Sequence, residues 1–251
     1  MPAPVTLPRL SWGDPHSRRH ALLVHGLGSD AALMWRYAVA LADAGWRADA
    51  VDLRGHGSAP RALDYTIEAY ATDLLHTAAA DDEPWDLVVG HSLGGASATL
   101  ASANAPAWTR RLVLIDPAIH LSDRDRKTVR TSQQRAFADT SQAAVRAEHP
   151  DWHELDIELK AAAAAAASRY AVEQTSVQNT PWDVREAASR LTVPTHVIAG
   201  DPAVYSIFDG ALAEEVLRNP VVSMTVVPGT GHSPHRDDPD AAAAALLAWL
   251  G

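Results

Sequence analysis

A short apolar strand runs straight into a tight turn and a helix in the segment Trp85-Asp86-Leu87-Val88-Val89-Gly90-His91-Ser92-Leu93-Gly94-Gly95. Leu87–Val89 has the continuous apolarity of a buried strand, and the residues after Ser92 predict a helix over Leu93–Asn104. The turn between them carries the pattern Gly-x-Ser-x-Gly, in which a serine at a strained strand-to-helix turn exposes its hydroxyl. We therefore predict that Ser92 is a nucleophile.

Further short apolar runs alternate with longer helical patterns along the chain, which is typical of a parallel sheet covered by helices on both faces. We predict an α/β fold with a mostly parallel central sheet of about 7–8 strands flanked by helices. The clearest strand candidates, besides the one before Ser92, are Ala21–Val24, Ala48–Val51, Leu112–Ile115, Thr195–Gly200 and Met224–Val227.

Helices are predicted over Ala31–Ala44, Thr66–Ala80 and Pro239–Leu250. From residue 119 to 186 no strand pattern is seen, and the composition indicates helices over Asp123–Ala147 and Asp151–Gln174, divided near His149-Pro150. We expect residues 119–186 to form a helical cap inserted after the strand that ends near Asp116, with residues 1–118 and 187–251 forming the core domain. A peripheral helical layer with no role in the site is the alternative.

Composition excludes several classes of function. The chain has 251 residues and no cysteine, which excludes disulfides, thiolate metal sites and a cysteine nucleophile. A net charge of −10 argues against a nucleic-acid partner. No window is apolar enough for a membrane span or a signal peptide, so a cytoplasmic protein is expected. No spacing of ligands points to a metal, and no cofactor is expected.

The chain resembles the α/β-hydrolase family over nearly its whole length. Three motifs besides the Ser92 turn carry the resemblance, in the family's order: His25-Gly26-Leu27-Gly28 after a strand, Asp52-Leu53-Arg54-Gly55-His56-Gly57-Ser58 after the next, and Gly229-Thr230-Gly231-His232-Ser233 after the last. The resemblance implies a serine nucleophile, a histidine base and an acid. It also implies that the main-chain N–H groups of Leu27 and Leu93 form an oxyanion hole.

A serine hydroxyl is a poor nucleophile at neutral pH and needs a base within hydrogen-bond reach. His232 is the candidate because it follows the last predicted strand in a glycine-flanked loop. His235 is its competitor. We expect His25 to brace the oxyanion loop, His91 to orient or pack, and His56 to make local hydrogen bonds.

The base in turn needs a carboxylate. Asp201 follows the strand Thr195–Gly200, and Asp116 follows Leu112–Ile115; both stand in Asp-Pro, so local sequence does not separate them. We prefer Asp201 because its strand comes directly before the strand of the histidine loop, and the order Ser92, Asp201, His232 is the family's. Asp52 is expected to fix a loop near Arg54.

Bulky side chains near these motifs predict a mainly apolar pocket for a small-molecule carbonyl substrate. Core packing is the alternative for each of them. The candidates are Met34, Trp35, Trp152, Trp182, Tyr205 and Phe208.

These observations predict a serine hydrolase that cleaves a carboxylic ester or lactone through an acyl-enzyme on Ser92. A carbon–carbon bond hydrolase of the diketone type, using the same three side chains, is an alternative. Thioester and amide cleavage and a lyase also stay open. A ligand receptor that retains the pocket without turnover is an alternative from a different class.

Overall fold

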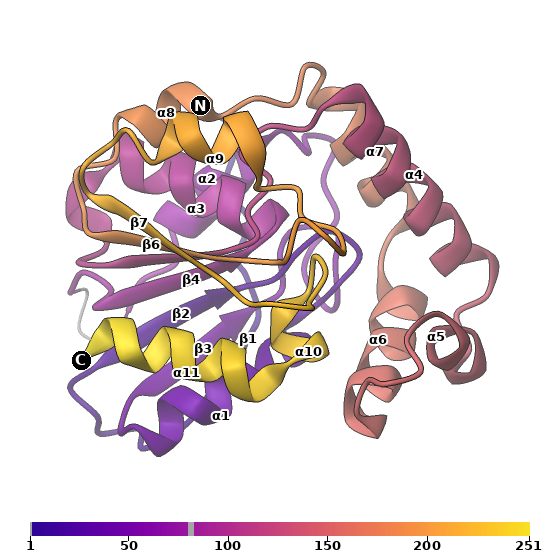
Figure 1. Cartoon of the computed structure of the whole chain (residues 1–251), viewed down its shortest axis with the longest axis horizontal. Helices are drawn as coiled ribbons and strands as arrows, with labels where there is room; N and C mark the ends of the chain where they lie inside the picture. The colour runs from indigo at the N-terminus through magenta and orange to yellow at the C-terminus, as the bar shows by residue number, and fades with distance from the viewer. Residues whose placement is uncertain (1, 80–82) are drawn as a thin grey trace.

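The computed structural model describes residues 2–79 and 83–251. Its strands are β1 Arg9–Trp12, β2 His20–Val24, β3 Arg47–Val51, β4 Leu87–His91, β5 Leu112–Ile115, β6 Thr195–Ala199 and β7 Val222–Val226. They form one sheet in the order β1-β3-β2-β4-β5-β6-β7 (Figure 1). β1 is antiparallel to β3, and every other neighbouring pair is parallel.

The predicted α/β fold with its mostly parallel sheet is confirmed. The interior strands β4, β5 and β6 are buried along their whole length, as their continuous apolarity indicates. The sequence pattern missed β1, because this edge strand is largely exposed and mixes arginine and serine with apolar residues.

Helices cover both faces of the sheet. Their bounds are η1 Ala31–Met34, α1 Trp35–Asp43, α2 Ile67–Leu75, α3 Leu93–Asn104, η3 Pro106–Trp108, α4 Asp123–Ala138, α5 Gln142–Glu148, α6 Glu154–Ala166, α7 Arg169–Gln178, α8 Arg185–Ser189, α9 Gly210–Val216, α10 Pro234–Asp237 and α11 Pro239–Leu250. Figure 1 shows α1 and α11 on one face and α2, α3, α8 and α9 on the other. Each face has its own apolar core cluster against the sheet.

Two of the predicted helices, α3 and α11, have the bounds that the sequence indicated. The helix expected over Ala31–Ala44 is divided into a 3-10 turn, capped by the Asp30 side chain, and the α-helix α1. The helix expected to begin at Thr66 does so, with Thr66 as its N-cap, and ends at Leu75. Its expected end at Ala80 lies outside the described residues.

Across residues 2–79 and 83–251, no helix has both the length and the apolar character needed to cross a membrane.

Residues 119–186 hold α4 to α7, and the chain leaves α5 at His149-Pro150 as expected. α7 is fastened to the core through hydrogen bonds from Tyr70 to Thr175 (2.7 Å) and from the Ile67 amide to Asn179 (2.8 Å). Ala161, in the alanine run of α6, packs in a small apolar cluster of its own with Val145, Trp152 and Ile157. Figure 1 shows α4, α5 and α6 beyond the ends of the strands, on the side where the parallel strands finish.

Candidate active site

Ser92 is the single residue between β4 and α3, and its backbone conformation is strained. Its φ is 52° and its ψ −113°, a conformation that costs a non-glycine residue roughly 1–3 kcal/mol. The turn is held by a hydrogen bond from the Ser92 amide to the Ile115 carbonyl (3.1 Å). A Cβ at Gly94 would lie 2.4 Å from the Val24 carbonyl oxygen, so only glycine lets α3 start this close to β2. The local sequence therefore forces the Ser92 hydroxyl out at the strand end.

His232 lies between Ser92 and Asp116. Its Nε2 is 3.0 Å from Ser92 Oγ, and its Nδ1 is 2.6 Å from Asp116 Oδ2. A carboxylate only accepts hydrogen bonds, so Nδ1 carries the proton and Nε2 is free to accept one from the serine. Ser92, directly after β4, and Asp116, directly after β5, thus meet a histidine from the loop after β7. The arrangement can deprotonate the serine as it attacks.

Asp116 is fully buried and accepts four hydrogen bonds. Besides His232, the donors are the amides of Gly200 (3.2 Å) and Ile207 (3.1 Å) and the hydroxyl of Ser206 (2.5 Å). Its φ of 36° is the only other positive φ of a non-glycine residue in the described chain. So many donors hold the carboxylate in one orientation, and that orientation holds the imidazole.

The preference for Asp201 as the partner of His232 is wrong for this structure. Asp201 accepts instead from the amides of Ala203 (2.8 Å) and Gly229 (2.8 Å), which lowers its pKa and ties its side chain into the loop. The register explains why: Ile115 pairs with Ile198, so Asp116 follows directly on the paired residue, whereas Asp201 comes three residues after its own. Asp201 therefore projects beyond the edge where the imidazole lies.

The loop His25-Gly26-Leu27-Gly28 lies directly over the serine, since a Cβ at Gly26 would come within 3.1 Å of Ser92 Cβ. His25 Nδ1 donates to the Gly26 carbonyl (2.7 Å), and its Nε2 accepts from the Leu53 amide (3.0 Å). Because C=O and N–H point opposite ways in a trans peptide, this bond fixes the direction of the Leu27 N–H. The N–H of Leu93, in the first turn of α3, has no partner within its own helix. These are the two amides expected to form an oxyanion hole.

Side chains from two other segments hold the far end of this loop. His56 Nε2 accepts from the Gly28 amide (3.1 Å), and His56 Nδ1 donates to the Arg54 carbonyl (3.0 Å). Gln133 of α4 donates to the Leu27 carbonyl (3.3 Å), and Lys160 of α6 donates to the Gly28 carbonyl (2.9 Å). The 119–186 segment thus contacts the loop beside Ser92 directly.

A family model described as the alpha/beta hydrolase family matches residues 21–245, which is most of the chain. The chain belongs to the alpha/beta hydrolase family. The matched region contains the strained serine turn, the loop before Gly28 and the histidine loop whose geometry is described above.

Relatives and solved structures agree with this membership. The chain is 37% identical over 107 residues to Esterase PIR7B of Oryza sativa subsp. japonica, covering 41% of this chain and 40% of that protein. It is 37% identical over 110 residues to Lipase LipV of Mycobacterium tuberculosis, covering 43% and 40%. Each match spans about two fifths of the relative's length. In three dimensions the chain is similar to E-2-(acetamidomethylene)succinate hydrolase, with a TM-score of 0.82, 23% identity and coverage of 98% and 95%.

Two other histidines of this alpha/beta hydrolase, His91 and His235, lie near the His232 ring without a hydrogen bond to Ser92. His91 donates through Nε2 to the main-chain carbonyl of His232 (2.9 Å), so it positions the loop that carries the imidazole. His235 is buried and stacks on Tyr37, with ring centroids 5.5 Å apart. Burial, reinforced by neighbouring positive charge, holds the pKa of both His91 and His235 well below the usual range. Both therefore stay neutral at physiological pH.

Asp52 is a loop-fixing carboxylate, as expected, but Arg54 is not its partner. Asp52 accepts from the amides of Ala31 (2.8 Å) and Ser58 (2.8 Å), joining the loops after β2 and β3. Arg54 instead forms a buried two-bond ion pair with Asp73, both distances 2.6 Å.

Five of the six bulky residues proposed for the pocket divide into two groups. Met34, Trp182 and Phe208 are buried in the core clusters of the sheet. Trp35 and Trp152 instead connect the 119–186 segment to the core, by donating to Asp156 (2.8 Å) and Asp237 (2.7 Å) respectively.

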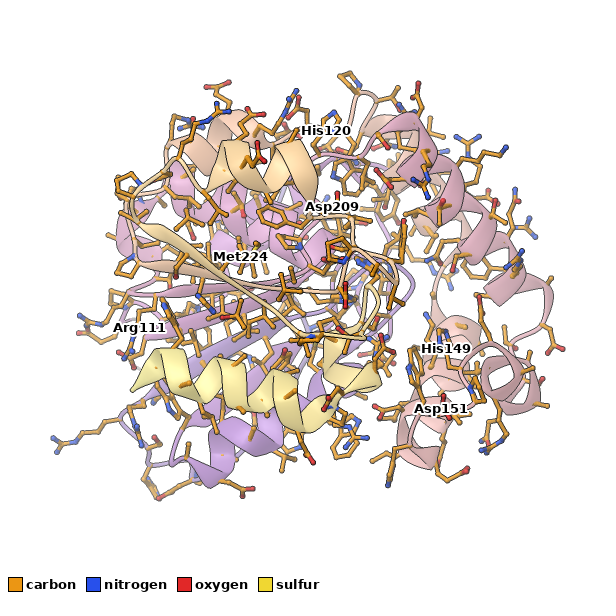
Figure 2. The ribbon with its side chains drawn as sticks, in the orientation of Figure 1. Arg111, His120, His149, Asp151, Asp209 and Met224 are labelled. Carbon is orange, nitrogen blue, oxygen red and sulfur yellow. The ribbon has the colours of Figure 1, made fainter. Side chains whose placement is uncertain are left out.

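Tyr205 has its ring centroid 6.3 Å from that of His232 and also lines a cavity of about 330 Å³. The cavity lies between the start of the 119–186 segment and the loop before α9, where Figure 2 shows His120 and Asp209. Its walls are largely polar, with Arg124 and Asp125 among the lining residues. Among the described residues, no group of three or more histidine and acidic side chains is arranged to hold a metal ion.

Sequence reasoning missed three kinds of site residue. Asp116 was a candidate but was not preferred. Ser206, which donates to Asp116, was not considered. Neither were Gln133 and Lys160, which donate to carbonyls of the loop over Ser92. No local signal separated Asp116 from Asp201, because each directly follows a predicted strand and stands in Asp-Pro. No local pattern marks Gln133 or Lys160, because their contacts depend on how the 119–186 segment packs.

Two buried histidines, His25 in the loop over Ser92 and His56 beside it, predict loss of stability in acid. Burial lowers the pKa of His25 to about 3 and that of His56 to about 4, whereas an unfolded histidine titrates near 6.5. The unfolded state therefore binds more protons below pH 6.5, and the stability present above that pH is lost progressively as pH falls toward 4. Each histidine contributes a slope of up to about 1.4 kcal/mol per pH unit.

Urea unfolding at pH values from 7 to 4.5 measures this slope. His56→Gln should reduce it, while the exposed His16→Gln should leave it unchanged. A free energy of unfolding that is constant from pH 7 to 4.5 contradicts the prediction.

Proposed function

We propose that this chain is a serine hydrolase that cleaves a carboxylic ester or lactone through an acyl-enzyme on Ser92. The observation that carries the proposal is the continuous chain of contacts Ser92 Oγ, His232 Nε2, His232 Nδ1 and Asp116 Oδ2, at 3.0 and 2.6 Å. Membership of the alpha/beta hydrolase family and the esterase and lipase names of two relatives support it. Asp116 takes the place that sequence reasoning gave to Asp201.

In the first half of the reaction, Ser92 Oγ attacks the carbonyl carbon while His232 Nε2 takes the hydroxyl proton. Asp116 keeps the imidazole in the tautomer that can accept this proton and stabilises the imidazolium that results. The amides of Leu27 and Leu93 donate to the oxyanion, and each such donor is typically worth about 2.7–4 kcal/mol in the transition state. The imidazolium then protonates the leaving alkoxide, and the acyl group stays on Ser92.

In the second half, His232 takes a proton from water, and the resulting hydroxide attacks the acyl-enzyme. Collapse of the second tetrahedral intermediate returns the proton to Ser92 Oγ and releases the acid. A lactone reacts in the same way, except that the alcohol and the acid leave as one molecule. All proton transfers pass through His232 Nε2, and the proposed reaction uses no cofactor.

A fluorophosphonate probe and a substrate panel test this function together. We expect the probe to label Ser92 and the protein to turn over many equivalents of p-nitrophenyl esters, with lactones, anilides and an activated diketone compared at equal concentration. Labelling without turnover of any panel member contradicts the proposed hydrolase and favours a ligand receptor. Faster turnover of the diketone than of every ester contradicts the assignment to esters.

A further inference from the structure

Arg236 is a buried guanidinium with an unused hydrogen-bonding edge. It lies on α10, four residues after His232, and is only 5% exposed. Its Nη1 donates to Ser233 Oγ (3.3 Å), and the Trp152 ring covers it at 5.2 Å from the centroid. Its Nε and Nη2 have no hydrogen-bond partner in the described part of the chain.

The same edge of two other arginines in this molecule binds a carboxylate. Arg54 directs Nε and Nη2 to Asp73, and Arg36 directs Nε and Nη2 to Asp156. These two parallel N–H donors match the two oxygens of a carboxylate. A buried cation without such a partner is strongly destabilising. Arg236 thus presents a carboxylate-binding edge and no carboxylate.

Lys160 places a second cation beside the first. Its Nζ donates to the Gly28 carbonyl, at the end of the loop over Ser92, and no described carboxylate lies within 4.0 Å of it. Burial and the charge of Arg236 together lower the pKa of Lys160 to about 8.

The acidic side chains around this pair are engaged elsewhere. Asp30 caps η1, Asp156 binds Trp35 and Arg36, and Asp237 accepts from Trp152 and the Gly231 amide. Glu148 and His149 complete the charged surroundings of the pair. Figure 2 shows His149 where the 119–186 segment approaches α10. None of these carboxylates lies within 4.0 Å of Arg236 or Lys160, although the charges of Asp156, Asp237 and Asp30 each act to raise the pKa of Arg236.

The two cations frame one side of the candidate active site. Lys160 reaches the oxyanion loop from α6, and Arg236 reaches from α10, which begins two residues after His232. Figure 1 shows α6 and α10 facing each other across the junction of the 119–186 segment with the core. Arg236 and Lys160 therefore come from the two segments that meet beside Ser92, namely the loop region that follows His232 and the 119–186 segment.

We propose that the substrate carries a carboxylate, bound by the Nε–Nη2 edge of Arg236 and by the Lys160 ammonium, while its ester carbonyl lies at Ser92. This inference rests on the proposed hydrolase function and replaces the mainly apolar substrate that the sequence predicted. The free carboxylate supplies the partner that both cations lack, so an acid monoester is the substrate class that fits.

Matched pairs of p-nitrophenyl esters test the proposal. The neutral butanoate, pentanoate and hexanoate are compared with the hemisuccinate, hemiglutarate and hemiadipate, which add a terminal carboxylate at three distances from the carbonyl. We expect kcat/KM to favour at least one anionic ester by roughly 30-fold or more, and Arg236→Met to remove that preference. Arg236→Lys keeps the positive charge but loses the paired Nε and Nη2 donors, so it should retain part of the preference for anionic esters.

Lys160→Met should also reduce the preference for anionic esters. The control variants Lys127→Met, at the only other lysine, and Arg218→Met should leave that preference unchanged, because both side chains are exposed. If Arg236 served the fold alone, Arg236→Met would lower the melting temperature and slow both ester classes equally. We expect its melting temperature to be maintained or raised, since the variant removes a buried unpaired cation.

Binding of glutarate to Ser92→Ala, measured by calorimetry, gives a readout that does not depend on turnover. Binding that Arg236→Met removes supports the proposal. No binding, together with equal turnover of neutral and anionic esters, overturns it. If the wild-type protein hydrolyses none of the esters, the proposed function fails, and the glutarate measurement still decides whether the anion site exists.

Discussion

Ser92→Ala is expected to reduce kcat on p-nitrophenyl butanoate by about 10⁴- to 10⁶-fold. The hydroxyl is the group that His232 Nε2 can activate on the strained turn, and the chain has no cysteine that could act in its place. What remains after its removal is the rate that the oxyanion amides and binding alone supply. Initial rates and a fluorophosphonate labelling time course measure the effect.

Ser102→Ala is the matched control, because Ser102 lies on the same helix and its buried hydroxyl has no partner in the described chain. This variant should keep full activity, and its fold should be as stable as that of the wild type. Circular dichroism of both variants checks that a loss of rate is not a loss of fold. A Ser92→Ala variant that retained more than about a tenth of the activity would exclude the acyl-enzyme mechanism.

Asp116→Asn and Asp201→Asn are expected to differ by about three orders of magnitude or more in kcat. Asn at position 116 can present an N–H to His232 Nδ1, which favours the tautomer with its proton on Nε2 and blocks proton transfer from the serine. Such a change in a comparable triad reduces kcat by about 10⁴-fold. Asp201 contacts only loop amides, so its replacement should change kcat less than about threefold.

Rates of the two variants on the same ester decide between the carboxylates. Melting temperatures are measured beside them, because Asp116 also accepts from Ser206 and two amides, and its replacement should lower stability. Equal large losses would mean that Asp201 acts through the histidine loop. A large loss at position 201 alone would restore the original preference for that residue.

Much of the candidate site was predictable because its signals are local. The strand, the glycine-flanked serine and the start of the helix lie within eleven consecutive residues, so Ser92 and the start of α3 could be placed from that segment. The loop His25–Gly28 and the glycine-flanked His232 are similarly short patterns. Buried parallel strands were recognised because they are apolar on both faces, and the exposed edge strand β1 was missed because it is not.

Which of the two carboxylates binds His232 could not be predicted from neighbouring residues in the sequence. Asp116 and Asp201 stand in the same dipeptide at the ends of neighbouring strands, and only the register of β5 against β6 puts one of them against the imidazole. The contacts of Gln133 and Lys160 with the oxyanion loop depend in the same way on how α4 and α6 pack.

The sequence by itself determined the fold class, the serine and the histidine, because strand periodicity and tight turns are enforced by residues that are neighbours in the chain. Tertiary structure alone decided which aspartate faces His232 and which cations lie unpaired beside the site. Those outcomes depend on strand register and on the packing of residues 119–186, and the free energies involved come from contacts between residues 106 to 132 positions apart.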